Sequence, residues 1–133
     1  MNSSASPNPE PKVRERPEIL EGRTYKKKTG CGNIYVTVND FGGPPFEVFV
    51  RLGKSGGCSS AYCEAIGRLV SSWLRAGQDV HEVIQQLGGI CCHSGHGGQM
   101  SCPTAIAEAL KEAIGEADQS KHPEPHGDRA GGP

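Results

Sequence analysis

Four cysteines stand where a thiol can act as a metal ligand or as a nucleophile. Each lies beside a glycine or where a helix is expected to begin, and consecutive members are separated by 26, 33 and 9 residues. Glycine lets the backbone turn tightly around a ligand because it has no Cβ. Four thiolates can supply the complete ligand set of a tetrahedral zinc site. We therefore expect a metal site formed by Cys31, Cys58, Cys92 and Cys102.

Two of these cysteines are expected at helix N-termini, which stabilise a thiolate. Cys58 falls at or just before the start of one predicted helix, and Cys102 at the N-cap of another. Free N–H groups and a positive partial charge there favour the deprotonated thiol, the form that binds metal or attacks electrophiles. Two alternatives stay open. The thiols could be redox-active, or they could be plain core residues, because a lone cysteine most often packs as a small apolar side chain.

The other cysteines and the nearby histidines are weaker candidates. Cys63 is predicted inside the long helix as a core residue, and Cys91 as a spare thiol that cannot easily share one small metal with Cys92. His93 and His96 are reserve ligands or neighbours of the ligands, and the alternative for both is a solvated loop position. No P-loop, GxSxG or HExxH motif is present, so the sequence indicates no autonomous active site.

Net charge and cysteine content indicate which partners and which redox compartment suit the protein. The chain has 133 residues and a formal net charge of −1, so its overall electrostatics favour neither nucleic acid nor membrane. It begins without an apolar leader segment, and it contains no run approaching about 18 apolar residues. Six cysteines without an export signal favour metal or redox chemistry over a disulfide framework. We expect a cytoplasmic protein with reduced thiols.

Strands are expected in the first half of the chain. Residues 25–28 form a short candidate strand. Runs of β-branched and aromatic residues, typical of strands, occupy 34–39 and 46–51. Glycine, proline and aspartate fill 40–45 between the last two runs, which is turn chemistry. The pattern therefore predicts an antiparallel hairpin.

Three helices are expected to follow the hairpin. Apolar residues recur at helical spacing over 61–74, and Gly77 ends that helix. Asp79 caps a short helix that stops at Gly88-Gly89, and Pro103 fits the first position of a last helix. The expected fold is α+β, a small antiparallel β-hairpin or sheet packed against about three helices.

Both ends of the chain lack the apolar residues that a core needs. We expect residues 1–18 and 118–133 to be disordered and residues 19–117 to form one domain. A domain of about a hundred residues buries only a modest core, so a structural metal would stabilise it considerably.

Longer motifs surround the same four cysteines. They are Thr29-Gly30-Cys31-Gly32-Asn33, Gly53-Lys54-Ser55-Gly56-Gly57-Cys58, Gly89-Ile90-Cys91-Cys92 and Ser101-Cys102-Pro103. In this order, within residues 16–117, the chain resembles the TSCPD domain at the C-terminus of adenosylcobalamin-dependent (class II) ribonucleotide reductases. The family's pattern of four cysteines falls on the four thiols chosen above. In place of the namesake Thr-Ser-Cys-Pro-Asp the chain reads Met100-Ser101-Cys102-Pro103-Thr104, so the acidic residue is missing.

This resemblance implies a detached accessory domain. The reductases' catalytic barrel has no counterpart within 133 residues, and no cysteine follows Cys102 to form a redox-active tail. We therefore expect a zinc-binding accessory or interaction domain whose partner is the catalytic subunit of a ribonucleotide reductase. Adenosylcobalamin would enter only through that partner, and the label ribonucleoside-diphosphate reductase would apply by homology alone.

Two other functions stay open at this point. A thiol-redox protein could deliver electrons to a reductase through Cys91 and Cys92 beside Cys102, because a thiolate at a helix start exchanges with partner thiols. A nucleotide-binding regulatory module could use the basic run 26–28 and the glycine-rich loop 53–57. The alternative for those lysines is a solvated strand edge that they protect from aggregation.

Overall fold

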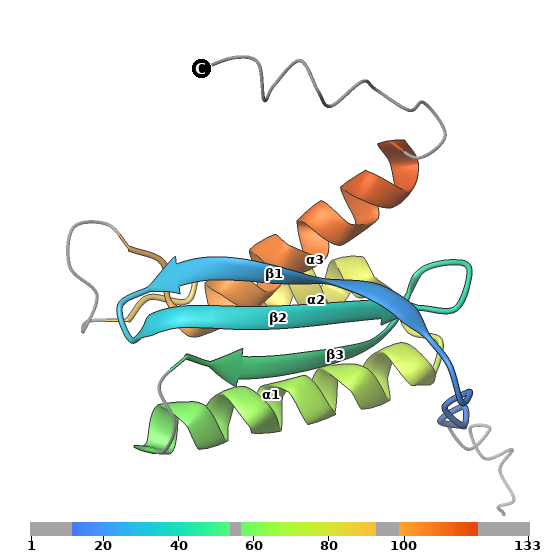
Figure 1. The fold of residues 1–133 in the computed structure, drawn as a ribbon, viewed down its shortest axis with the longest axis horizontal. Coiled ribbons are helices and arrows are strands. Elements are labelled where there is room, and N and C mark those ends of the chain that lie inside the picture. The colour runs from blue at the N-terminus through green and yellow to red at the C-terminus, as the bar shows by residue number, and fades with distance from the viewer. Residues whose placement is uncertain (1–11, 54–56, 93–98, 120–133) are drawn as a thin grey trace, which may run out of the picture.

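The computed structural model describes residues 12–53, 57–92 and 99–119. These residues form a three-stranded antiparallel sheet and three helices, which confirms the expected α+β class (Figure 1). The elements, in chain order, are β1 (Glu21–Thr29), β2 (Gly32–Asp40), β3 (Pro45–Leu52), α1 (Gly57–Arg75), α2 (Val80–Leu87) and α3 (Cys102–Gln119).

The first strand is longer than the sequence predicted. β1 begins at Glu21, and it pairs with β2 along its whole length, from Glu21 opposite Asp40 to Thr29 opposite Gly32. Its first residues have little strand propensity of their own, so pairing with β2 determines their conformation. Gly30 and Cys31 form the turn between the two strands, and Gly32 then adopts a φ of 111°, a conformation that favours glycine.

One face of the sheet carries the core. Ile34, Val36 and Val38 alternate along β2 and are all buried, as expected for a strand with one apolar face. They share the core with Ile106 and Leu110 of α3. In the view of Figure 1, α2 and α3 lie behind the sheet, and α3 contacts all three strands.

α1 runs along the outer edge of β3 (Figure 1). The hydroxyl of Ser71 accepts a hydrogen bond from the Val48 N–H at 2.9 Å and donates one to the Val48 carbonyl at 3.0 Å. Gly67 permits the close approach, because a Cβ there would lie only 3.3 Å from the Val50 side chain. The helix therefore covers an edge that would otherwise expose unpaired backbone groups.

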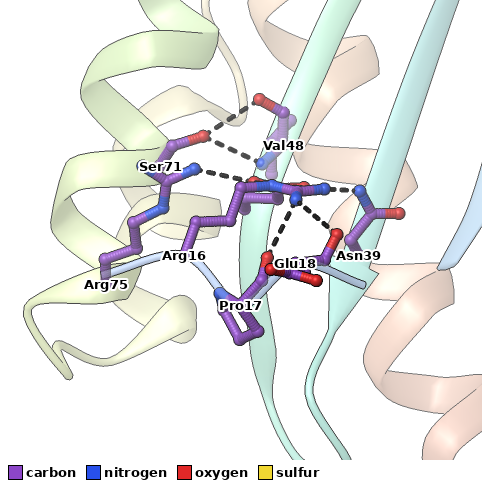
Figure 2. Close-up of polar contacts among 8 residues, drawn as sticks. Arg16, Pro17, Glu18, Asn39, Val48, Ser71 and Arg75 are labelled. Carbon is purple, nitrogen blue, oxygen red and sulfur yellow. Dashed lines mark hydrogen bonds and ion pairs between the residues drawn. The ribbon is translucent and has the colours of Figure 1, made fainter. Parts of the chain in front are cut away.

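A buried carboxylate lies where the N-terminal segment meets β3 and α1. The side chain of Glu47 has no exposed surface, and it accepts hydrogen bonds from Arg16 at 2.9 Å, Arg75 at 2.7 Å and Asn39 at 2.7 Å. Figure 2 shows these three donors, Arg16, Arg75 and Asn39, converging from different segments. Burial alone would raise the pKa of Glu47, but these hydrogen bonds outweigh it and hold the pKa below its usual range.

Part of the N-terminal segment contacts the domain. Arg14 donates to the Arg75 carbonyl from its backbone N–H at 3.1 Å and from its Nε at 2.8 Å. Arg14 and Arg16 therefore contribute contacts to the fold, although the sequence assigned them to a disordered end. The acceptors of their guanidinium groups are backbone carbonyls at the end of α1 and the Glu47 carboxylate. These acceptors are distant in sequence, so the sequence pattern does not predict the contacts. The predicted disorder of residues 1–11 and 120–133 concerns segments outside the described residues.

Candidate metal centre

The start of α3 differs by one position from the prediction. Ser101, rather than Cys102, caps the helix, because the Thr104 N–H donates to the Ser101 hydroxyl at 3.2 Å. Cys102 is then the first helical residue and Pro103 the second. The Ser101 hydroxyl also donates to the Ile90 carbonyl, so it ties the segment that carries Cys91 and Cys92 to the start of α3.

Thr29 joins the hairpin turn to the start of α3. Its hydroxyl donates to the Gly32 carbonyl at 2.7 Å and accepts from the Cys31 N–H at 3.0 Å. The Cys102 thiol donates to the same hydroxyl at 3.7 Å. Thr29 is only 2% exposed, and it forms a parallel bridge with Met100. Sequence reasoning missed this residue, although a threonine two positions before an amide is a known local hydrogen-bonding pattern.

Three thiols from three different elements interact at this junction. Cys63 is buried at 2% exposure, as predicted, but its thiol also hydrogen-bonds with that of Cys102. Burial, together with the charges of Cys102 and Cys31, raises the pKa of Cys63 to about 12. Burial also raises the pKa of Cys102; the charge of Cys31 adds to that effect, and the hydrogen bond with Thr29 opposes it. The structure therefore brings two predicted ligands together, and it adds Cys63, which sequence reasoning left in the core.

The other two predicted ligands, Cys58 and Cys92, lie on segments whose neighbouring residues contact this junction. Cys58 is exposed in the first turn of α1, and the next residue, Ser59, has its hydroxyl 3.7 Å from the Cys31 sulfur. Cys92 is half-buried, and the loop that follows it, with His93 and His96, lies outside the described residues. Cys91 is exposed, with its thiol directed at the Gly89 carbonyl at 3.7 Å.

Among the side chains that the structure describes, no three from His, Cys, Asp and Glu are arranged to hold a metal ion. The chemistry of the donors nevertheless suits zinc, because thiolates are its preferred soft ligands. Burial is the main cause of the raised pKa of Cys63 and of Cys102, and the charges of neighbouring thiols add to it. A divalent cation would counteract the effect of these charges.

A groove of about 750 Å³ lies between α1 and the sheet face that the described helices leave open. Tyr35 and Phe49 line its floor, and Arg68 lines the wall formed by α1. The Arg51 guanidinium lies 5.7 Å from the centre of the Tyr35 ring, and Lys26 pairs with Tyr35 from the other side. A single row across the sheet therefore holds an aromatic ring between two cations.

The basic run on β1 is divided between the two faces of the sheet. Lys26 and Lys28 are exposed, and strand alternation places both on the open face. Lys27 points the other way and forms an ion pair with Glu112 of α3. Most of the predicted glycine-rich loop, residues 54–56, lies outside the described part of the chain.

The structure defines a small α+β domain with cysteines at a hairpin turn and at two helix starts. The chain belongs to the TSCPD domain family, which matches residues 7–114. TSCPD domains are found in ribonucleotide reductase-associated proteins. No curated protein and no solved structure matches the chain. No helix among the described residues is long and apolar enough to cross a membrane.

Proposed function

We propose that this chain is a zinc-binding accessory domain that acts with a ribonucleotide reductase and relies on that partner for catalysis. The observation that carries the proposal is the junction at Thr29, where Cys31 and Cys102 meet although 70 residues separate them in sequence. Membership of the TSCPD family supports the link to ribonucleotide reduction.

Zinc would be held by Cys31 and Cys102 together with Cys58 and Cys92. The Ser59–Cys31 contact supports the participation of the start of α1, and the Ser101–Ile90 contact supports that of the segment before Cys92. A site closed by four thiolates is structural, so the bound metal would fasten the hairpin turn, α1 and α3 together.

Metal analysis of the full chain, purified without oxygen, tests the zinc proposal. We expect about one zinc per chain, the stoichiometry of a single closed site, and four thiols that react with an alkylating reagent only after chelation. A zinc content far below one per chain would contradict the proposal. The Cys91→Ser variant is the matched control, because this exposed thiol lies outside the ligand set and should leave the zinc content unchanged.

The proposed partner is the catalytic subunit of an adenosylcobalamin-dependent reductase, with the cobalamin bound only there. Co-sedimentation of the full chain with such a subunit, and a ribonucleotide reduction assay with and without the chain, test this step. Absence of both binding and any effect on turnover would rule out the partner while leaving the zinc result intact.

The thiol-redox alternative has less support. A redox-active thiol needs a low pKa, whereas burial raises the pKa of Cys102, the helix-start thiol on which this alternative depends. A reversible disulfide with a midpoint potential near that of thioredoxin, about −270 mV, would favour the redox function instead.

Nucleotide binding is the second candidate function, and the groove over β2 and β3 favours it. The exposed Phe49 ring and the half-buried Tyr35 ring line this groove and can stack on a base. Arg51 in the groove, and Lys26 paired with Tyr35 on the next strand, can pair with phosphates. A titration of the full chain with ATP tests this function; an absence of heat and of any spectral shift would remove it.

A further inference from the structure

The open face of the sheet carries two aromatic rings on adjacent strands. Tyr35 of β2 is half-buried, and Phe49 of β3 is 53% exposed. Phe49 lies opposite Thr37, so the two aromatic residues are diagonal neighbours, which lie about 7–8 Å apart in antiparallel sheets. In Figure 1, α2 and α3 lie behind the sheet, so neither helix covers the rings. The two rings therefore form a platform on which flat groups can stack.

Basic side chains lie on both sides of these rings. Lys26 of β1 and Arg51 of β3 occupy the two ends of the cross-strand row that has Tyr35 at its centre. Lys28 is exposed, and strand alternation places it on the same face as Lys26. Arg68 of α1 lines the groove from the side and is 78% exposed. A flat ligand on the rings would therefore have cations on both sides of it.

Acidic groups cancel only part of this positive charge. Among the described residues that line the groove, Glu64 is the one acid, and it pairs with Arg68 one helical turn away. Glu47 belongs to the same face, but its side chain has no exposed surface and pairs with two arginines. Lys26, Lys28 and Arg51 therefore leave this face positive, although the formal net charge of the chain is −1.

We propose that this face binds single-stranded nucleic acid, with bases stacked on the two rings and phosphates paired with Lys26, Lys28 and Arg51. Such a strand alternates flat bases with anionic phosphates, so it matches the rings and the cations together. The proposal rests on the groove that favours nucleotide binding, and it extends the ligand from one nucleotide to a strand. Two rings carry that extension, because a mononucleotide has one base and can stack on only one of them.

The contact between Arg51 and Tyr35 is compatible with this binding mode. The guanidinium lies 5.7 Å from the centre of the Tyr35 ring, close to the limit of about 6 Å for a cation–π contact. Arg51 is exposed, so it can leave the ring for a phosphate at little cost. A charge-assisted hydrogen bond to phosphate is stronger than an exposed cation–π contact, so the exchange favours the bound strand.

The rings favour a single strand over two other anionic ligands. In a duplex the bases stack on one another, so only the phosphates would contact this face. An acidic peptide would pair with the cations, but its carboxylates would leave the rings without a stacking partner. Because every base has a flat face, binding should depend little on the base sequence.

Fluorescence anisotropy with labelled oligothymidylates and oligouridylates tests the proposal on the full chain, with ATP as the single-nucleotide competitor. We expect the affinity to rise at least about tenfold between ATP and a strand of about four nucleotides, because a second base is stacked. A duplex of equal length should bind at least about tenfold more weakly than the strand. Three paired phosphates predict a slope of about −2 for log affinity against log salt concentration.

Replacing Phe49 with alanine should weaken strand binding about tenfold or more, because one stacked base loses its ring. Phe41→Ala is the matched control, because Phe41 is 67% exposed in the turn after β2 and does not line the groove. Thermal melts of both variants verify that they are folded.

A second pair of variants tests the phosphate contacts and alters exposed side chains only. Lys26→Ala should make the salt slope shallower by about 0.7, the contribution of one phosphate contact to a single strand. Lys111→Ala removes an exposed cation from α3, behind the sheet, and should leave the slope unchanged.

The outcomes separate this proposal from the nucleotide function on which it rests. A strand that binds no more tightly than ATP would overturn the proposal and leave single-nucleotide binding in place, whereas binding of neither would overturn both. Strand binding without ATP binding would support the proposal and exclude the single-nucleotide function. Equal affinity for strand and duplex, or equal effects of Phe49→Ala and Phe41→Ala, would also overturn it, because charge alone would then explain the binding.

Discussion

The hydroxyl of Ser71 in α1 pairs with both backbone groups of Val48 in β3, at 2.9 Å to the N–H and 3.0 Å to the carbonyl. One side chain thus forms the two backbone hydrogen bonds that a neighbouring strand would otherwise form at this edge of the sheet. Ser71 is only 7% exposed, so water cannot readily replace these two hydrogen bonds.

Replacing Ser71 with alanine should destabilise the domain by about 2 kcal/mol, because two buried backbone groups lose their partner. Chemical denaturation of the variant and the wild type measures the change in the free energy of unfolding. The control is Ser72→Ala on the same helix, since Ser72 is exposed. Equal stability of the two variants would show that the Val48 contact contributes little.

Replacing Glu47 with glutamine should cost on the order of 3 kcal/mol at neutral pH, because Arg16 and Arg75 would lose the buried charge that pairs with them. Glu108→Gln is the control, since Glu108 forms an ion pair with Lys111 at the surface of α3. Urea denaturation at pH 7 measures both variants. A Glu47→Gln variant as stable as wild type would mean that desolvation of the ions cancels their attraction.

The contribution of Glu47 should depend on pH with a definite sign. Its pKa in the folded protein lies below the usual value of 4.5, so the unfolded chain takes up the proton first as the pH falls. The stabilisation is therefore complete above the unfolded pKa, and it is lost as the pH falls through the folded pKa. Melts of wild type and Glu47→Gln between neutral and acidic pH should converge at the acidic end, and a constant difference would contradict the assignment.

Replacing Cys102 with serine should unfold or severely destabilise the domain if the proposed zinc is bound. Binding of a structural zinc contributes on the order of 10 kcal/mol to folding, comparable to the whole net stability of a small domain. Cys63→Ser should cost less, about 1–3 kcal/mol, for a polar atom in the core. Thermal melts with and without a chelator measure both variants. A Cys102→Ser variant that melts like wild type, together with an inert chelator, would exclude the zinc site.

Replacing Arg51 with glutamate should weaken ATP binding at least about tenfold if the groove holds a nucleotide, because a phosphate would meet a like charge. Lys111→Glu introduces the same change of charge on α3, away from the groove, and should leave the affinity unchanged. Calorimetric titration of both variants provides the comparison. If both lose affinity equally, the effect comes from net charge rather than from the groove.

Local signals in the sequence determined most of the secondary structure. Asp79 caps α2 as predicted, because its carboxylate accepts from the His81 N–H at 2.9 Å, an interaction between neighbouring residues. Gly77 and Gly88 mark helix ends for similarly local reasons. The family followed from motifs around the cysteines, and the placing of Cys58 and Cys102 at helix starts followed from the helix signals.

Contacts between distant segments decided the rest. The extension of β1 depends on its pairing with β2, and the burial of Glu47 depends on Arg16, which precedes β1, and on Arg75 at the end of α1. Cys63 lies beside Cys102 only because α1 and α3 meet at the hairpin turn. Sequence periodicity specifies which face of an element is apolar, but it does not specify which other element covers that face. The tertiary structure alone therefore showed that Thr29 lies between the hairpin turn and the thiol of Cys102.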